Sequence, residues 1–194
     1  MTIRISKPAF NLREKITQLE GRVPFERMPV GSMMLIGRNT SSNRTNISSN
    51  SSWTNIVGAD IEVHPRLASS LLEIHMNFTM EAQNAISGIG FRIYRQLYYM
   101  SNVVGPSVLI YDNYQHSHWG TGNWTGPGTM ILEVYDNPYS AVADVDGSVT
   151  TDVTTKGTSI YYYAQGYKET GNNLYVNYGQ DAEGLLVTVK EIRQ

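Results

Sequence analysis

The stretch LLEIHMNFTM, residues 71–80, decides the fold, because apolar and polar side chains alternate along it from its second residue onward. The apolar positions are Leu72, Ile74, Met76, Phe78 and Met80. A period of two residues places successive side chains on opposite faces of a β-strand. The stretch therefore predicts a strand with one face in a core and the other face in water.

The same period recurs on both sides of this stretch. Ile89, Phe91 and Ile93 form a second alternating set. Further strands are predicted at residues 34–37, 53–64, 108–111, 130–135, 159–165, 174–178 and 185–192. About nine strands with turn-rich connections are typical of a β-sandwich. We therefore expect an all-β fold, a jelly-roll-like antiparallel β-sandwich with one short N-terminal α-helix.

That helix is predicted within PAFNLREKITQLEG, residues 8–21. Asn11 is a suitable N-cap, and Glu14 follows it three residues later as in a capping box. Gly21 provides a left-handed C-terminal stop. These local signals agree on one short helix at the start of the chain.

An apolar stripe follows one side of the predicted helix. It consists of Leu12, Ile16 and Leu19, with Phe10 just before it. A stripe of this width resembles the seam of a coiled coil. A helix of about ten residues is not stable alone in water, so it needs a partner. The partner is its own β domain, further copies of the helix, or another protein, and these four residues are the predicted docking or oligomerisation contacts.

Three segments are predicted along the chain: a docking or oligomerisation helix segment at 1–21, a linker at 22–31 and a β-sandwich head domain at 32–194. Pro24, Pro29 and Gly31 favour extended backbone in the linker. Within the head, NTSSNRTNISSNSS at residues 39–52 is a polar stretch of low complexity. We expect it to form a loop that buries little.

The composition excludes several classes of protein. The 194 residues carry a net charge of −2 and contain no run of Lys or Arg, so nucleic acid is not an expected partner. Neither the apolar core of a signal peptide nor a run of about 18 apolar residues occurs, so we expect synthesis in the host cytoplasm and no membrane insertion. Cysteine is absent, which excludes disulfides and thiolate chemistry.

Several segments, taken in order, resemble a known family. They are SSWTNIVGADIEVHPRLASSLLEIHMNF, GFRIYR, GTSIYYYAQGYKETGNNLYVNYG and LLVTVKEI. They resemble the jelly-roll-like β-sandwich at the ends of many bacteriophage tail-fibre and spike proteins. That family shows a strand ending in Pro, a double Ser before a strong strand, a Gly-Phe-Arg type strand and a last strand ending in Glu-Ile. PAFNLREKITQLEG is similar to the N-terminal segment of virion proteins from marine phages, notably cyanophages.

The resemblance implies a non-enzymatic virion structural protein that forms a homotrimer and docks on another virion protein through its N-terminal segment. Family fibres usually place a long shaft after such an N-terminus, whereas only a short linker follows here. A compact fibre or spike head, displayed on the particle and able to bind a host surface glycan, therefore fits better. The alternatives are a capsid decoration or knob protein and, from another class, a carbohydrate-active enzyme.

The segment YDNYQHSHWGTGNWTG, residues 111–126, contains the predicted glycan-binding residues. Aromatic rings offer apolar faces at low entropic cost, and amides add directed hydrogen bonds. The predicted set is Tyr111, Tyr114, Trp119, Asn123 and Trp124. The alternative is that the two tryptophans are buried where this connection covers the sandwich.

His116 and His118 lie in the same segment, two residues apart. In extended backbone their imidazoles point to one side, where they can bind a transition metal. The pair resembles the His-x-His iron sites of some trimeric phage fibres, although those occur in a different fold. The alternative is two exposed histidines without a ligand.

No catalytic residues and no cofactor are predicted. The sequence GTGNWTG at 120–126 has Thr125 where a dinucleotide-binding loop needs its third glycine. ADVDG at 143–147 lacks most oxygen ligands of a calcium loop. The carboxylates are scattered in sequence, although a glycosidase pair can also come from separate strands.

Overall fold

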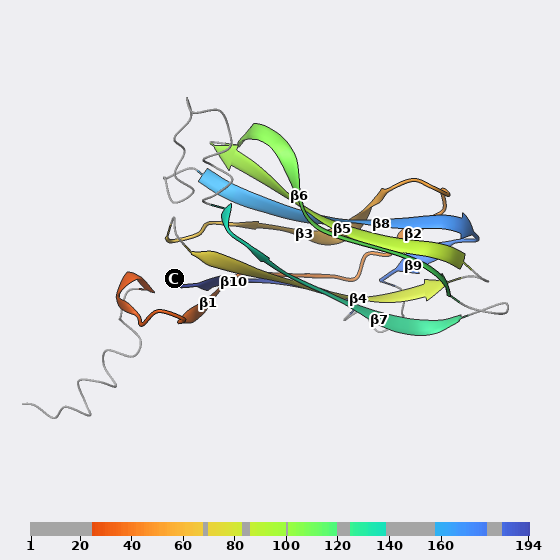
Figure 1. Ribbon diagram of the computed structural model, residues 1–194, viewed down its shortest axis with the longest axis horizontal. Helices are drawn as coiled ribbons and strands as arrows, with labels where there is room; N and C mark the ends of the chain where they lie inside the picture. The colour runs from red at the N-terminus through yellow and green to blue at the C-terminus, as the bar shows by residue number, and fades with distance from the viewer. Residues whose placement is uncertain are drawn as a thin grey trace, which may run out of the picture.

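The computed structural model describes residues 25–67, 70–82, 86–99, 101–119, 125–138, 158–177 and 184–194, and only the backbone of Glu26, 115–119 and 125–127. Two antiparallel sheets pack face to face in this part of the chain (Figure 1). The elements are η1 (Phe25–Arg27), β1 (Met33–Ser41), β2 (Thr45–Ile47), β3 (Thr54–Val63), β4 (Leu71–Ala82), β5 (Ile86–Tyr99), β6 (Asn102–Trp119), β7 (Thr125–Asp136), β8 (Thr158–Gly171), β9 (Leu174–Val176) and β10 (Leu185–Ile192).

The strand order is that of a jelly roll. In the first sheet, here called the β4 sheet, the long strands run β1-β10-β4-β7, and the short strands β2 and β9 extend it. The second, the β8 sheet, has the order β3-β8-β5-β6. Figure 1 shows the β8 sheet as the upper layer, with β1, β10, β4 and β7 below it. Eight long strands wound into two such sheets make a double-sheet jelly roll, which confirms the predicted fold class.

Residues 71–80 form the middle of the β4 sheet, as the alternation predicts. The five apolar side chains named above are each 5% exposed or less. Phe78 meets Phe91 of the opposite sheet, with ring centroids 5.1 Å apart. β4 pairs with β10 on one side and with β7 on the other, so this strand is central to the fold.

The polar stretch at 39–52 is exposed and without strands at 42–44 and 48–52, as predicted, but its other residues form strands. Its first three residues belong to β1, and Thr45–Ile47 form β2, with Ile47 fully buried and Thr45 only 4% exposed. Side chains and backbone of the stretch form hydrogen bonds with distant parts of the chain. Asn39 Nδ2 donates to the carbonyl of Asp60, and Asn177 Nδ2 donates to the carbonyl of Ser41. Polar residues can be ordered in a core when their hydrogen bonds are satisfied.

The buried carboxylate of Glu191 connects three of the sequence motifs described above: the strand that ends in Pro, the Ser before β4 and the Glu-Ile of the last strand. Glu191 of β10 is fully buried and accepts hydrogen bonds from the N–H of Arg66 and of Leu67 and from Ser70 Oγ, at 2.7–3.1 Å. These donors lie in the connection that follows Pro65 and ends with Ser70 before β4. The carboxylate therefore holds the β3–β4 connection against the last strand.

The predicted N-terminal helix and the residues Phe10, Leu12, Ile16 and Leu19 lie outside the described residues. The predicted linker is described from Phe25 onward, and the side chain of Phe25 is 1% exposed. The N–H of Gly31 donates to the carbonyl of Arg193 at 2.8 Å, and the N–H of Arg193 donates to the carbonyl of Ser32 at 2.9 Å. The described part of this segment is thus bound to the end of β10.

Candidate recognition surface

The outer face of the β8 sheet carries the largest group of partly exposed aromatic side chains in the described chain. β8 contributes Tyr161, Tyr163 and Tyr167, which alternate with buried residues such as Tyr162. The remaining members come from β5, β6 and the residue before β3. We call the following set the aromatic face: Trp53, Tyr94, Tyr98, Tyr114, Tyr161, Tyr163 and Tyr167.

The rings of the aromatic face contact one another in two groups. Tyr163 lies between Tyr94 and Tyr161, with centroid distances of 5.3 and 5.8 Å, and Tyr98 meets Tyr161 edge-on at 6.1 Å. In the second group, Tyr167 lies 4.9 Å from Trp53 and 5.3 Å from Tyr114. Rings at these separations stabilise one another and keep their orientations.

The Gly90-Phe91-Arg92 segment of β5 supports the second group. A Cβ on Gly90 would lie 2.8 Å from Trp53 Cη2, so only glycine leaves room for this ring. Phe91 faces the core. The Arg92 guanidinium lies over the Trp53 ring, 3.9 Å from its centroid, and Arg92 Nε donates to Asp112 Oδ2 at 3.0 Å. This cation–π contact helps to fix the orientation of the indole.

Carboxylates hold two of the tyrosine hydroxyls in place. Burial, followed by a hydrogen bond to Glu169, raises the pKa of Tyr114 to about 12. Burial and the hydrogen bond from its hydroxyl to Asp60 Oδ2, 2.9 Å long, also raise the pKa of Tyr161. Both phenols therefore remain neutral around pH 7, and each donates its proton to a fixed acceptor.

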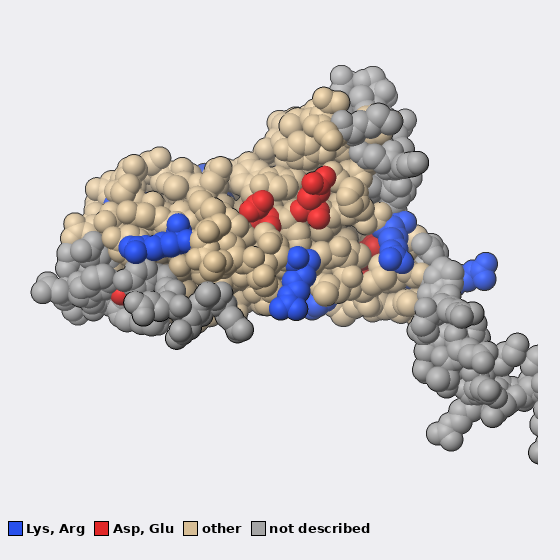
Figure 2. Space-filling view, turned by 180° about the vertical axis from the view of Figure 1, so that it is seen from behind, with Lys and Arg blue, Asp and Glu red and all other residues tan. Residues whose placement is uncertain are grey.

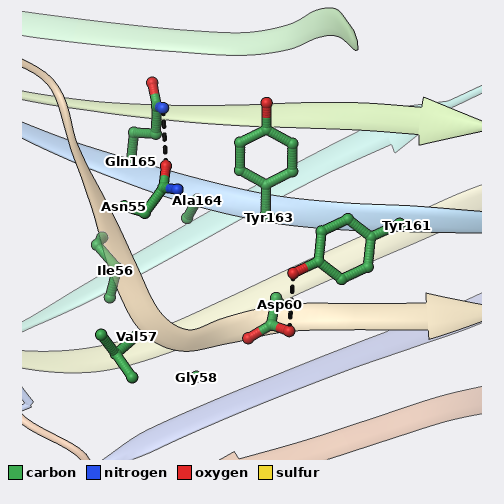
Figure 3. A pocket seen from close by; sticks show the side chains of 9 residues that line it. All are labelled: Asn55, Ile56, Val57, Gly58, Asp60, Tyr161, Tyr163, Ala164 and Gln165. Carbon is green, nitrogen blue, oxygen red and sulfur yellow. Dashed lines mark hydrogen bonds between the residues drawn. The ribbon is translucent and has the colours of Figure 1, made fainter. Parts of the chain in front are cut away.

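A pocket of about 340 Å³ opens beside the aromatic face, between β3 and β8 (Figure 3). The register pairs Asn55 with Gln165 and Asp60 with Tyr163, so four residues of β3, 56–59, bulge away from β8 opposite Ala164. The bulge separates the two strands and opens the pocket. Its volume is at the lower end of the range for small-ligand sites.

The polar stretch before β3 holds the bulge in shape. The N–H of Val57 donates to Thr45 Oγ1 at 2.8 Å, and Asn39 Nδ2 donates to the carbonyl of Gly58 at 3.2 Å. Gly58 has a φ of +80°, and a Cβ there would lie 2.3 Å from Ser41 Cβ. The pocket wall is therefore preformed by these hydrogen bonds and by a backbone conformation at position 58 that only glycine adopts without strain.

Amides and hydroxyls surround the pocket, and charge is sparse. Gln165 Nε2 donates to Asn55 Oδ1 at 2.8 Å, which leaves the Asn55 amino group and the Gln165 carbonyl oxygen outside this bond (Figure 3). On the face shown in Figure 2, charged side chains lie apart from one another on a mostly uncharged surface. Aromatic rings with adjustable polar groups are typical of recognition surfaces rather than of acid–base catalysis.

The structure describes the side chains of two of the five predicted glycan-binding residues, Tyr111 and Tyr114, and places them on different faces. Residues 111–119 belong to β6, a strand much longer than the predicted 108–111. Tyr114 belongs to the aromatic face, whereas Tyr111 packs against the buried core. The backbone of Trp119 pairs with Ile86, and its side chain lies outside the described part. Asn123 and Trp124 also lie outside the described residues.

The histidine pair falls at an irregular part of the same strand. Ser87 pairs with His118 and Ile89 pairs with Gln115, so β6 has one more residue than β5 between these pairs. The side chains of His116 and His118 lie outside the described part of the chain, and the metal site stays a prediction. Among the side chains that are described, no group of three or more His, Asp or Glu could hold a metal ion.

Sequence reasoning overlooked most of the aromatic face. The signal was present in YYYAQGY at residues 161–167, where Tyr161, Tyr163 and Tyr167 occupy alternate positions of the face opposite the buried Tyr162. Tyrosines repeated on the wetter face of a strand indicate an exposed aromatic surface. The pocket had no comparable signal, because it depends on a bulge in β3 and on contacts from β1 and β2.

Comparisons with known proteins gave remote likenesses only. No family model and no curated protein matched the chain. A structure titled infectious bursal disease virus Gx strain is 11% identical with a TM-score of 0.38, and the VP2 subviral particle of that virus is 13% identical with a TM-score of 0.37. Both matches cover 88% of this chain, which spans only 40% and 41% of those chains. No helix among the described residues is long and apolar enough to cross a membrane.

Proposed function

We propose that this chain is a bacteriophage virion structural protein, a compact fibre or spike head that binds a host surface glycan through the outer face of its β8 sheet. The aromatic face carries this proposal. Seven rings with fixed contacts, an adjoining pocket and uncharged amides provide the stacking surfaces and directed hydrogen bonds that sugars require. The proposed protein is an adhesin and not an enzyme.

The fold supports the proposal by analogy. Double-sheet jelly rolls occur in viral capsid domains and in lectins, so one architecture serves both the particle and sugar recognition. A fold does not by itself determine function. The analogy therefore only makes sugar binding more plausible, and the residues of the aromatic face must account for it. The phage assignment rests on the sequence resemblance described above.

Attachment to the particle is assigned to the N-terminal segment, with Phe10, Leu12, Ile16 and Leu19 as its apolar contacts. Phe25 and the hydrogen bonds between Gly31, Ser32 and Arg193 give this segment a firm base on the sandwich. A homotrimer, formed through the same segment, is the oligomer we propose. In such an arrangement the aromatic face stays free for a host ligand.

Location is tested by immunogold electron microscopy of intact particles with an antibody against residues 32–194. Label at the tail is the expected result. Label spread over the capsid shell would replace the adhesin by a capsid decoration protein. Absence of label from purified particles would contradict the virion assignment.

Glycan binding is tested with the full-length chain on immobilised host lipopolysaccharide and capsular polysaccharide. Saturable binding is expected, and Trp53→Ala should weaken it at least about tenfold because the indole holds Tyr167 of the aromatic face in place. Trp124→Ala is the matched comparison, since it removes a tryptophan from the segment favoured by sequence alone. Loss of binding only in Trp124→Ala would move the site away from the aromatic face, and release of reducing ends would identify an enzyme.

A further inference from the structure

The pocket between β3 and β8 is a built feature. Its outer wall is the bulge at residues 56–59, held by Asn39 and Thr45 and dependent on the positive φ of Gly58. Its other side is formed by Tyr161 and Tyr163, whose rings are fixed by neighbouring rings. Because the lining is already ordered, ligand binding loses little free energy to the ordering of side chains and loops.

The chemistry of the lining restricts what can enter. The side chains of Asn55 and Gln165 meet at one end of the pocket, and Tyr163 stands beside them (Figure 3). Asn55 Nδ2 can donate to a ligand hydroxyl, and Gln165 Oε1 can accept from one. The exposed side chain of Val57 adds apolar surface. A ring with hydroxyls at its edge and C–H groups on its faces matches this lining.

Charge narrows the choice further. Among the described residues that line the pocket, Asp60 alone has a carboxylate, and no Lys, Arg or His is present. Asp60 Oδ2 already accepts the proton of the Tyr161 hydroxyl. A sugar carboxylate or sulfate would meet this negative charge without a compensating cation, which disfavours acidic sugars.

We propose that this pocket is the specificity-determining subsite of the recognition surface and that it takes one uncharged pyranose ring of the bound glycan. Asn55 and Gln165 bind the ring hydroxyls, the tyrosines pack against the ring, and Asp60 rejects acidic sugars. The inference rests on the proposed glycan-binding function. It adds the class of sugar and the residues that select it.

The test is ligand-observed NMR titration of the full-length chain with the methyl glycosides of glucose, galactose and mannose and with the corresponding methyl glucuronide, galacturonide and mannuronide. At least one neutral glycoside should bind, and its uronide should bind at least about tenfold more weakly. Asn55→Ala with Gln165→Ala should weaken the neutral glycoside at least about tenfold. Asp60→Asn should reduce the difference between the neutral and acidic sugars.

Ser87→Ala with Thr170→Ala is the matched control, because these hydroxyls form another exposed cross-strand pair, between β5 and β8, 2.5 Å apart. This variant should bind like the unchanged chain. If the Asn55 and Gln165 variant also binds like the unchanged chain while Trp53→Ala loses binding, the pocket inference is overturned and the proposed function stands. If no neutral glycoside binds and the polysaccharides of the previous section do not bind either, both are overturned.

Discussion

Asp136 at the end of β7 forms a buried ion pair with Arg95 of β5, with 2.5 Å between Arg95 Nη1 and Asp136 Oδ1, and so joins the two sheets of the sandwich. The hydroxyl of Tyr162 donates to the other carboxylate oxygen at 2.8 Å. Arg95 and Asp136 are 4% and 6% exposed. One carboxylate thus serves a charged and a neutral partner in the core.

Asp136→Asn should lower the free energy of unfolding by about 3–5 kcal/mol, because it leaves the Arg95 charge buried without its counter-ion. Urea denaturation measures the change. The double variant Arg95→Met with Asp136→Leu is the control, since it removes both charges. It should recover most of the loss, and equal instability of both variants would show that the ion pair is not the cause.

Glu191→Gln should release the connection between β3 and β4. Hydrogen bonds to a charged acceptor contribute about 1.5–3 kcal/mol, and the amide places an N–H group among the donors of Arg66, Leu67 and Ser70. The backbone amides of Arg66 and Leu67 should exchange with deuterium faster. Glu62→Gln is the matched control, since Glu62 is exposed and accepts a hydrogen bond from the Ser159 hydroxyl. Unchanged exchange in both variants would contradict the role of Glu191.

Lys168→Met should stabilise the sandwich. Lys168 is fully buried, and its ammonium donates to Asn50 Oδ1 and to the carbonyl of Gly171 at 3.1 Å, so its described partners are uncharged. Burial lowers the pKa of Lys168. The unfolded chain therefore binds the extra proton between this lowered pKa and about 10.4, and stability rises with pH across that window. Denaturation of both proteins at several pH values should show this rise in the unchanged chain and its loss in Lys168→Met.

Above pH 10 the tyrosines should reverse that trend. Burial raises the pKa of Tyr162 well above its ordinary value, with the Asp136 carboxylate adding to the effect, and the pKa values of Tyr114 and Tyr161 are also raised. Unfolded tyrosines lose their protons near about pH 10, so the folded chain binds more protons above this pH and stability falls. As the pH is raised, the absorbance of these tyrosines as phenolates should therefore increase at the same pH at which the chain unfolds. Ionisation of all 13 tyrosines near pH 10 in a chain that stays folded would contradict this.

Deletion of residues 1–21 should leave the sandwich folded, because the cut spares Phe25 and the hydrogen bonds between Gly31, Ser32 and Arg193. Association with virions should be lost, as measured by co-sedimentation with particles that lack the protein. Replacing Phe10, Leu12, Ile16 and Leu19 with serine in the full-length chain should have the same effect. A truncated chain that still joins particles would contradict the docking role.

Strand positions were readable from sequence where one face of a strand is apolar. β10 has the predicted bounds, and β4 extends the predicted strand by two residues, because burial imposes a strict period on both. β2 was missed because Thr45 and Asn46 carry no apolar period, and only Ile47 enters the core. The polar residues around β2 form part of the fold through hydrogen bonds to distant strands, which local sequence does not reveal.

The recognition surface was less predictable for a related reason. Tyr114 was identified from its aromatic neighbours in sequence, but its neighbours in space are Tyr167 and the ring of Trp53 beyond it. Tyr167 comes from β8 and Trp53 directly precedes β3, so they lie 53 and 61 residues from Tyr114 in the sequence. Long-range pairing brings them together, whereas Tyr111, three positions away, turns toward the core.

The position of β10 determines when the molecule can be completed during synthesis. All four strands of the β8 sheet precede β10 in the sequence, so that sheet can pair without it. The β4 sheet cannot, because β10 lies between β1 and β4 and is made last. Its insertion also brings Glu191 to the β3–β4 connection. A strand must therefore enter a gap between two strands that lie far from it in the sequence, a pairing of high contact order that is slow and leaves both edges exposed until it forms.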